Sequence, residues 1–247
     1  VKSYKPFNKV PARPCVFEYI YFARPDSVMN GKNVYECRKK MGQQLALELN
    51  TKADIVIPVP DSGVPAALGY SEASSIPYNL GIIRNHYVGR TFIEPTQTIR
   101  QLGIKLKHNA NKSIIQNKRV ILIDDSIVRG TTAIKIVEMM RNAGATEVHM
   151  RISSPPIKFP DFYGIDTPSI NELIASSNSV EEIRKLLKLD SLHFLSLDGL
   201  YKSMGHKKRN NINPQYTDHC FTGDYPTSLV DRDDGALASQ LTLLNDK

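Results

Sequence analysis

The segment with the most chemistry in this sequence is residues 120–132. Two adjacent carboxylates, Asp124 and Asp125, directly follow the apolar run Val120-Ile121-Leu122-Ile123. Carboxylates suit sugar hydroxyls, which donate hydrogen bonds, or a divalent cation. Five residues later, Gly130-Thr131-Thr132 opens a helical pattern. Small residues at a helix start let backbone N–H groups close around a phosphate, and the helix dipole favours its negative charge.

Like charges repel, so a phosphate is expected to bind to the part of this segment that lies away from the two carboxylates. Asp124 and Asp125 suit ribose hydroxyls or a divalent cation. The phosphate is assigned to Ser126, Ile127, Val128, Arg129, Gly130, Thr131 and Thr132. An Asp-Asp pair alone could simply cap a helix. The complete pattern, an apolar run followed by DDSxxxGTT, favours the ligand interpretation, and the Walker pattern GxxxxGK[ST] is absent.

Hydrophobic patterning predicts the elements that must position this segment. Strands are expected at 53–59, 119–123 and 146–152, with a weaker candidate at 191–197. Helices are expected at 35–49, at 64–73, and from 132 to about 140, closing near 142–144. This alternation predicts an α/β fold, with a mostly parallel sheet covered by helices on both faces. Ligands bind such sheets beyond the carboxyl ends of the strands.

Two further segments are candidates for the same edge of the sheet. The loop Pro60-Asp61-Ser62-Gly63 follows the first expected strand. The stretch 84–111 is polar, too long for a simple connector, and rich in basic residues. We interpret it as a lid over the active face. Its basic residues are Arg84, Arg90, Arg100, Lys105 and Lys107.

Composition narrows the function classes. The formal net charge is +7, but no basic stripe interleaved with aromatic residues appears, so a small polyanionic substrate is favoured over nucleic acid. Cys15, Cys37 and Cys220 lie far apart and are expected to be reduced thiols. No membrane-length apolar run and no secretory signal is found, and the expected location is cytoplasmic.

The motifs together resemble the amidophosphoribosyltransferase family of type I phosphoribosyltransferases. The 120–132 segment is similar to the family's signature for 5-phosphoribosyl-1-diphosphate (PRPP). Residues 17–27 resemble the opening of its transferase domain, and 85–93 resemble its flexible loop. Residues 163–166 and 172–175 are similar to later landmarks, and the match runs from about Cys15 to about Thr227.

The resemblance implies a reaction and a set of roles. Ammonia attacks C1 of PRPP, pyrophosphate leaves, and 5-phosphoribosylamine forms in the first step of purine biosynthesis. Asp61, Ser62 and Gly63 would take the pyrophosphate, and Arg84, Tyr87 and Arg90 would belong to the flexible loop. Mg²⁺ would bind Asp124 and Asp125, with Ser62 as a weak third ligand. A homo-oligomer and a separate glutaminase chain are the implied partners; nucleic acid and membranes are not.

The sequence also departs from the family pattern. The glutaminase domain with its catalytic cysteine is missing, so ammonia rather than glutamine is the expected nitrogen source. Of four cluster-binding cysteines in one branch, Cys15 matches the first, whereas Asp161, Pro214 and Thr217 stand at the other three. We therefore expect no [4Fe–4S] cluster. Gly63 replaces a serine that is often a metal ligand, and His86 replaces a common arginine.

The expected organisation is a linker remnant at 1–14, a phosphoribosyltransferase domain at 15–205, and a polar tail at 206–247 that is expected to be irregular and loosely packed from Asn210 onward. Three alternatives remain open at this point. They are a salvage transferase acting on a nucleobase, a non-catalytic PRPP-binding regulator, and a catalytically dead fragment.

Overall fold

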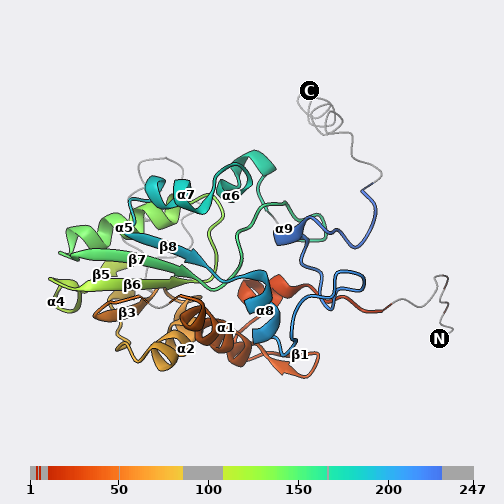
Figure 1. The fold of residues 1–247 in the computed structure, drawn as a ribbon, viewed down its shortest axis with the longest axis horizontal. Helices are drawn as coiled ribbons and strands as arrows, with labels where there is room; N and C mark the ends of the chain where they lie inside the picture. The colour runs from red at the N-terminus through yellow and green to blue at the C-terminus, as the bar shows by residue number, and fades with distance from the viewer. Residues whose placement is uncertain are drawn as a thin grey trace.

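A four-stranded parallel sheet forms the centre of the computed structural model, which describes residues 4, 6, 11–49, 51–85, 108–165 and 167–229. Its strands are β3 (Ile55–Pro58), β6 (Arg119–Asp124), β7 (Glu147–Ile152) and β8 (Ser191–Phe194), in the order β3-β6-β7-β8 (Figure 1). All three neighbouring pairs are parallel. Parallel strands need crossover connections, which helices usually supply. The predicted α/β class is confirmed.

Helices cover both faces of the sheet, because its central strands bury apolar side chains on both sides. The helices α1 (Val34–Glu48), α2 (Val64–Ser74) and α8 (Leu197–Ser203) pack on one face, and α5 (Thr131–Asn142) and α7 (Val180–Leu186) on the other (Figure 1). Successive residues of β6 alternate between the two cores. Ile121 and Ile123 belong to the first, and Val120 and Leu122 to the second.

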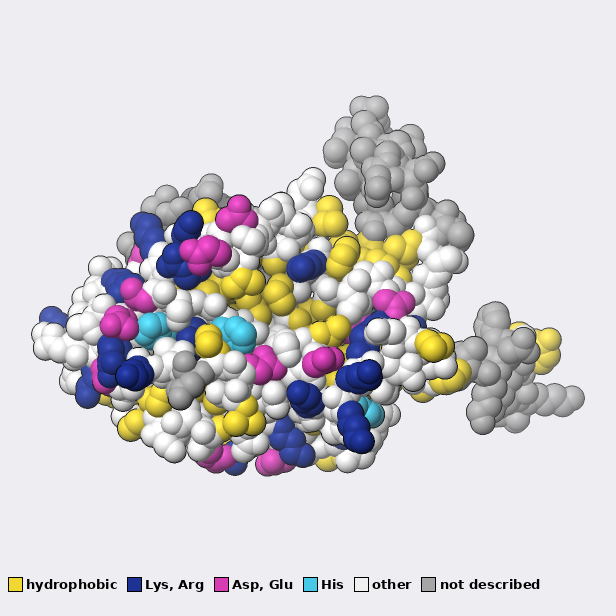
Figure 2. Space-filling model, viewed as in Figure 1, with side chains coloured by type: hydrophobic (Ala, Val, Ile, Leu, Met, Phe, Trp, Pro, Cys, Tyr) yellow, Lys and Arg dark blue, Asp and Glu magenta, His cyan; other side chains and the backbone are white. Residues whose placement is uncertain are grey.

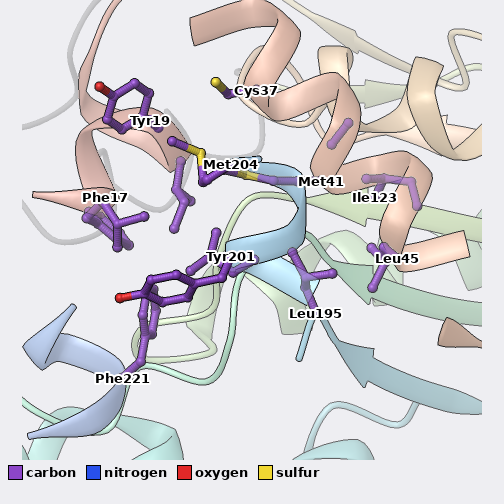
Figure 3. Close-up of a cluster of buried hydrophobic side chains, with 14 of the residues drawn as sticks. Phe17, Tyr19, Cys37, Met41, Leu45, Ile123, Leu195, Tyr201, Met204 and Phe221 are labelled. Carbon is purple, nitrogen blue, oxygen red and sulfur yellow. The ribbon is translucent and has the colours of Figure 1, made fainter. Parts of the chain in front are cut away.

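The first core joins elements from both ends of the chain. Figure 3 shows Phe17 and Tyr19, Met41 of α1, Tyr201 of α8 and Phe221 around one apolar interior. The aromatic segment 17–22 includes η1, a π-helix at Glu18–Phe22. Its residues 17, 19 and 20 are buried, whereas Tyr21 and Phe22 are about half exposed.

The shorter elements connect these layers. They are β1 (Val28–Met29), β2 (Lys32–Asn33), β4 (Ile82–Arg84), β5 (His108–Ala110), α4 (Lys112–Ile115), the 3₁₀-helix η3 (Ile170–Glu172), α6 (Ile174–Ser177) and α9 (His219–Thr222). β4 and β5 pair antiparallel, so the two ends of the basic stretch 84–111 lie side by side. The rest of the predicted lid, including Tyr87 and Arg90, lies outside the described residues. In the part of the chain that is described, no helix is long and apolar enough to span a membrane.

Two glycines allow α1 and α2 to pack with their backbones in contact. A Cβ atom built on Gly42 of α1 would lie 1.8 Å from the Ala66 carbonyl oxygen, and one on Gly69 of α2 would lie 1.9 Å from the Lys39 carbonyl oxygen. Since real Cβ atoms never approach so closely, any side chain at either position would separate the helices. This contact positions α2, which begins directly after Gly63.

The segment after residue 206 is not a loosely packed tail throughout. Tyr216, Asp218, His219 and Phe221 are buried, and Tyr216 and Phe221 belong to the first core. The prediction of loose packing is therefore wrong for residues 216–221. The segment looks polar in sequence because its buried polar groups pair with charged and hydroxyl partners, among them Arg209 and Tyr201 for Asp218 and Asp161 for His219. The domain boundaries themselves stay a prediction.

Ion pairs hold this segment in place. Asp218 is fully buried and accepts hydrogen bonds from Arg209 Nε at 2.7 Å and Arg209 Nη2 at 3.1 Å, and from Tyr201 Oη at 2.8 Å. A two-point contact with arginine compensates a buried carboxylate. Nearby, His219 Nε2 lies 2.8 Å from Asp161 Oδ2, and its ring stacks on Tyr225.

At the amino ends of β3 and β6, an Arg–Asp pair predicts a pH-dependent contribution to stability. Asp54 accepts hydrogen bonds from the backbone N–H and the guanidinium of Arg119, and these contacts lower the pKa of Asp54 to about 2. The lowered value means that the stabilisation is present above about pH 4 and is lost as the pH falls toward 2. Because both side chains are more than one-third exposed, we expect Asp54→Asn to cost less than about 1 kcal/mol at neutral pH.

Thermal unfolding of the wild type and Asp54→Asn, followed by circular dichroism between pH 7 and pH 3, measures this effect. The difference in midpoint should shrink as the pH falls. Asp26→Asn, in the exposed Arg24–Asp26 pair, is the control and should change nothing measurable. An Asp54→Asn difference that is constant across this range would contradict the assignment.

Candidate functional site

The acidic pair lies where β6 ends, at the carboxyl edge of the sheet. Asp124 is the last residue of β6 and is partly buried, whereas Asp125 is 5% exposed. Asp124 Oδ1 accepts a hydrogen bond from the backbone N–H of Asp125 at 2.9 Å. Ser126 Oγ donates to Asp125 Oδ2 at 2.5 Å. These local contacts fix the direction of both carboxylates without using all of their acceptor capacity.

The loop after β3 lies against the end of β6, as the sequence predicted for two loops at one edge. The backbone N–H of Val59 donates to the carbonyl oxygen of Ile123 at 2.8 Å, which continues the pairing of the two strands. Ser62 Oγ donates to Asp124 Oδ1 at 3.5 Å, a long contact. The side chain that faces the acidic pair is therefore that of Ser62.

Gly63 is required by the close approach of the two loops. A Cβ atom at this position would lie 2.3 Å from the Ile123 carbonyl oxygen and 2.9 Å from the Val59 carbonyl oxygen. A serine at position 63 does not fit this backbone. In this chain the hydroxyl group near the acidic pair is therefore that of the neighbouring residue, Ser62, and position 63 is glycine.

Two helix N-termini point to the same edge. α5 begins after Gly130, which has φ +80°, a left-handed conformation that glycine adopts readily. No side chain caps the helix there, and Thr131 and Thr132 are exposed. The first backbone N–H groups of α5 are thus available to an anion. The second helix, α2, begins after Gly63 and also lacks a side-chain cap.

The middle of the predicted phosphate segment is anchored by contacts with the rest of the fold. The side chain of Ile127 is 4% exposed and belongs to the second core. The Val128 carbonyl oxygen accepts from the N–H of Ile174, and Arg129 Nε donates to Glu172 Oε1 at 3.0 Å. The side chains of Ile127 and Arg129 therefore serve to hold the loop, and its contribution to an anion site comes from backbone N–H groups and hydroxyls.

A buried arginine behind the acidic pair was missed by the sequence analysis. Arg38 of α1 is 4% exposed and donates to the carbonyl oxygens of Tyr19 and Ala23. Burial lowers the pKa of Arg38, and the nearby Asp125 carboxylate acts in the opposite direction. Sequence spacing contained the signal, since Arg38 interrupts the apolar series Val34, Met41 and Leu45.

Burial and charge also act on Asp124. Burial raises the pKa of the Asp124 carboxyl well above its ordinary value, and the adjacent Asp125 carboxylate raises it further. Adjacent carboxyls do not ionise independently. A cation at this position would relieve the repulsion, because opposite charge favours the ionised form.

Arg84 is the only member of the predicted flexible-loop set that lies in the described part of the chain. It ends β4, and its guanidinium forms an ion pair with the carboxylate of Asp61 in the loop after β3. This contact places an arginine at the edge of the predicted pyrophosphate loop. Both side chains are substantially exposed to solvent.

The side chains at the end of β6 fit a magnesium ion by type. Mg²⁺ prefers oxygen ligands, takes one or two carboxylates, and keeps several water or substrate-phosphate ligands. Asp124 offers such oxygens, with the Ser62 hydroxyl 3.5 Å from Asp124 Oδ1 and the Asp125 carboxylate close enough to act on its pKa. Within the described residues, no group of three His, Cys, Asp or Glu side chains could hold a metal ion by itself. Any Mg²⁺ here would therefore complete its coordination with water or with substrate oxygens.

The structure brings a different set of residues together around Cys15 than the four positions compared with the family's cluster-binding cysteines. Cys15 pairs with Thr217 through a β-bridge, and Cys15, Asp161 and Cys220 line one small cavity. Cys220 lies with Cys15 and Asp161, so two thiols are present in this region, and the assignment of Pro214 stays a prediction. Burial raises the pKa of the Cys15 thiol and raises that of Cys220 well above its ordinary value. The absence of a cluster stays a prediction.

Comparisons with known proteins agree with this geometry. The family model of the phosphoribosyl transferase domain matches residues 26–153, which include both loops and the acidic pair. The chain is 58% identical over 245 residues to an amidophosphoribosyltransferase of Rhizobium etli, and the matched region covers 99% of this chain and 49% of that protein. It is 55% identical over 215 residues to the amidophosphoribosyltransferase of Bacillus subtilis, with 87% of the chain and 45% of that protein covered.

A solved structure shows the same likeness. It is the glutamine PRPP amidotransferase of Bacillus subtilis complexed with ADP and GMP, which matches with a TM-score of 0.83 and 53% identity over 92% of this chain and 50% of that one. The chain spans about half the length of the curated relatives it matches. The sheet, the two loops at its carboxyl edge and the matched family profile lead to one conclusion: this chain belongs to the phosphoribosyl transferase domain family and resembles the phosphoribosyltransferase part of amidophosphoribosyltransferases.

Proposed function

We propose that this chain binds Mg²⁺ and PRPP at the carboxyl edge of its sheet and transfers ammonia to C1 of PRPP. The products are 5-phosphoribosylamine and pyrophosphate. The observation that carries the proposal is the acidic pair at the end of β6, next to the uncapped N-terminus of α5. One strand-loop-helix unit thus offers acceptors for ribose hydroxyls and donors for the 5′-phosphate.

The two helix N-termini give the substrate its direction. The 5′-phosphate would bind the N–H groups and hydroxyls of residues 126–132 at the start of α5. The ribose hydroxyls would donate to Asp124 and Asp125. The pyrophosphate would then extend toward the loop 60–63 and the start of α2, where Arg84 is close. Contacts at both ends of the substrate hold C1 in a defined place, which reduces the entropy cost of the reaction.

The residues of the site act on the leaving group. A bond forms between the ammonia nitrogen and C1, while the bond between C1 and the pyrophosphate oxygen breaks, and the product ammonium loses a proton to solvent. Positive charge develops at C1 and negative charge on the pyrophosphate. Arg84 and the N–H groups at the start of α2 stabilise the departing anion. Mg²⁺ would supply further neutralisation of the phosphate oxygens when bound.

Surface charge supports a small anionic substrate. Figure 2 shows basic and acidic side chains interspersed over the visible face of the molecule. Nucleic-acid-binding surfaces instead gather lysine and arginine in one patch or stripe. The regulator and the dead-fragment alternatives share the binding site with the enzyme, so only turnover separates them.

Pyrophosphate release is the direct test of the proposed activity. The purified chain, mixed with PRPP, Mg²⁺ and an ammonium salt, should release pyrophosphate at a rate that rises with the ammonia concentration. Ribose 5-phosphate in place of PRPP is the control and should give none. No release at any ammonium concentration would favour the regulator or the dead fragment. Release supported by glutamine without ammonium would contradict free ammonia as the nitrogen source.

Replacing Asp125 by asparagine should weaken PRPP binding by about ten- to hundredfold, because a charged acceptor for a ribose hydroxyl is lost. Calorimetric titration with PRPP in Mg²⁺ buffer measures the dissociation constant, and circular dichroism checks that the variant is folded. Asp54→Asn is the matched control, since it makes the same change at the opposite edge of the sheet and should bind normally. Full turnover in Asp125→Asn would mean that the acidic pair only caps the helix.

The raised pKa of Asp124 predicts that its ionised form destabilises the metal-free protein. The folded state holds the Asp124 proton more tightly than the unfolded state. Stability from this group is therefore full below about pH 4 and is lost as the pH rises through the folded-state pKa. Asp124→Asn cannot ionise, so at neutral pH in EDTA it should unfold a few degrees higher than the wild type.

Thermal unfolding between pH 4 and pH 8, with and without Mg²⁺, measures this difference. The advantage of Asp124→Asn should vanish near pH 4, and Mg²⁺ should stabilise the wild type more than the variant. A variant less stable than the wild type at pH 8 in EDTA would show that the ionised carboxylate is favourable in the fold.

A further inference from the structure

The loop that is proposed to bind pyrophosphate carries a negative charge of its own. Asp61 lies between the end of β3 and Ser62, and its side chain is 58% exposed. A carboxylate beside a pyrophosphate anion repels it, so a direct ligand role for Asp61 is unfavourable unless a cation lies between them. The structure contains such a cation, because the Arg84 guanidinium forms an ion pair with Asp61.

The pair joins two separate elements at the rim of the site. Asp61 belongs to the loop between β3 and α2, whereas Arg84 is the last residue of β4. The backbone of the loop is held independently of this pair. Val59 N–H donates to Ile123 O, Gly63 N–H donates to Val59 O, and Val64 N–H donates to Asp61 O. The ion pair is therefore not needed to shape the loop, and its effect falls on where the Arg84 side chain rests.

Both members of the pair are accessible to solvent, with Arg84 37% exposed and Asp61 58% exposed. Exposed pairs of this kind contribute only about 0.2–1 kcal/mol. A pyrophosphate group carries several negative charges and two or more oxygens in reach of a guanidinium, and binds arginine more strongly than a single carboxylate does. Exchange of Arg84 from Asp61 to pyrophosphate is thus favourable, because little free energy is lost when the exposed pair breaks.

From these observations we propose that Asp61 is a positioning residue. It holds Arg84 at the rim of the pyrophosphate loop until the substrate's diphosphate replaces Asp61 as the partner of Arg84. This inference rests on the proposed function of the site and adds a role for a residue that sequence analysis assigned to pyrophosphate itself. Asp61 thereby pre-orients the arginine and also competes with the ligand for it. When pyrophosphate leaves, the carboxylate takes Arg84 back, which favours product release.

The proposal predicts that removing a charged side chain from this binding loop tightens ligand binding. Asp61→Asn removes the competing anion, so the dissociation constant for Mg²⁺-pyrophosphate should fall by about three- to fivefold, the equivalent of an exposed pair. The KM for PRPP should fall in parallel. Arg84→Gln should raise the dissociation constant by about tenfold, since a charged contact is lost.

A double-mutant cycle on Asp61 and Arg84 separates this mechanism from others. In the Arg84→Gln background, Asp61→Asn should change the dissociation constant by less than twofold, because there is no arginine to release. If Asp61 acted only by direct repulsion, the same substitution would tighten binding at least as much in that background. If Asp61 were a metal ligand, Asp61→Asn would weaken binding and raise the Mg²⁺ requirement. Either result would overturn the proposal.

The experiment uses calorimetric titration of the whole chain and its variants with inorganic pyrophosphate and Mg²⁺, and steady-state assays with PRPP. Asp54→Asn is again the matched control, because Asp54 is paired with Arg119 at the far edge of the sheet. PRPP turnover without coupling between Asp61 and Arg84 would contradict this inference and leave the proposed activity intact. Coupled pyrophosphate binding without turnover would sink the proposed activity alone. Failure of wild type and variants to bind pyrophosphate would sink the inference.

Discussion

The parallel pairing of β3 with β6 is the constraint on which the site depends. In this register Pro58 lies beside Ile123, and the Val59 N–H to Ile123 O bond extends the pairing one residue beyond β3. The loop that follows must therefore run against the end of β6, close enough that only glycine fits at position 63. A slip of one residue would turn every side chain of β3 to the other core and separate the Ser62 hydroxyl from Asp124.

Charged groups are arranged around this junction. The buried Arg38 is near enough to Asp125 to feel its charge, and Arg84 pairs with Asp61 in the loop that runs against the end of β6. The buried cation partly offsets the charge of Asp125. Helix N-termini supply donors without adding a full charge. A site of this kind suits a substrate that carries phosphate at both ends and hydroxyls between them.

Local pattern was sufficient to predict the sheet and the loops. β3 and most of β6 are apolar runs rich in β-branched residues, β7 alternates apolar with polar residues, and each expected boundary lies within a few residues of the observed one. The Asp124–Asp125 pair and Gly130 were likewise identified from spacing alone. Both predictions depend on neighbours in the chain, which the sequence displays directly.

Other features depend on contacts that the sequence does not display. Asp61 and Arg84 are far apart in the chain, so the sequence suggested two separate pyrophosphate ligands and not an ion pair. The segment around Asp218 looked like a polar tail, because its burial relies on Arg209 and Tyr201. Cys220 joined Cys15 through the folding of that same segment. Each of these features depends on which side chains the fold brings together, and spacing along the chain does not display that.

The central claim is that the turn after β6 holds a phosphorylated sugar. A crystal structure of the chain soaked with PRPP and Mg²⁺ tests it most directly. The account predicts density for the 5′-phosphate at the N–H groups that begin α5, with the ribose hydroxyls against Asp124 and Asp125. A turn that stays empty at saturating ligand, or a phosphate bound elsewhere with the carboxylates against it, would contradict the account.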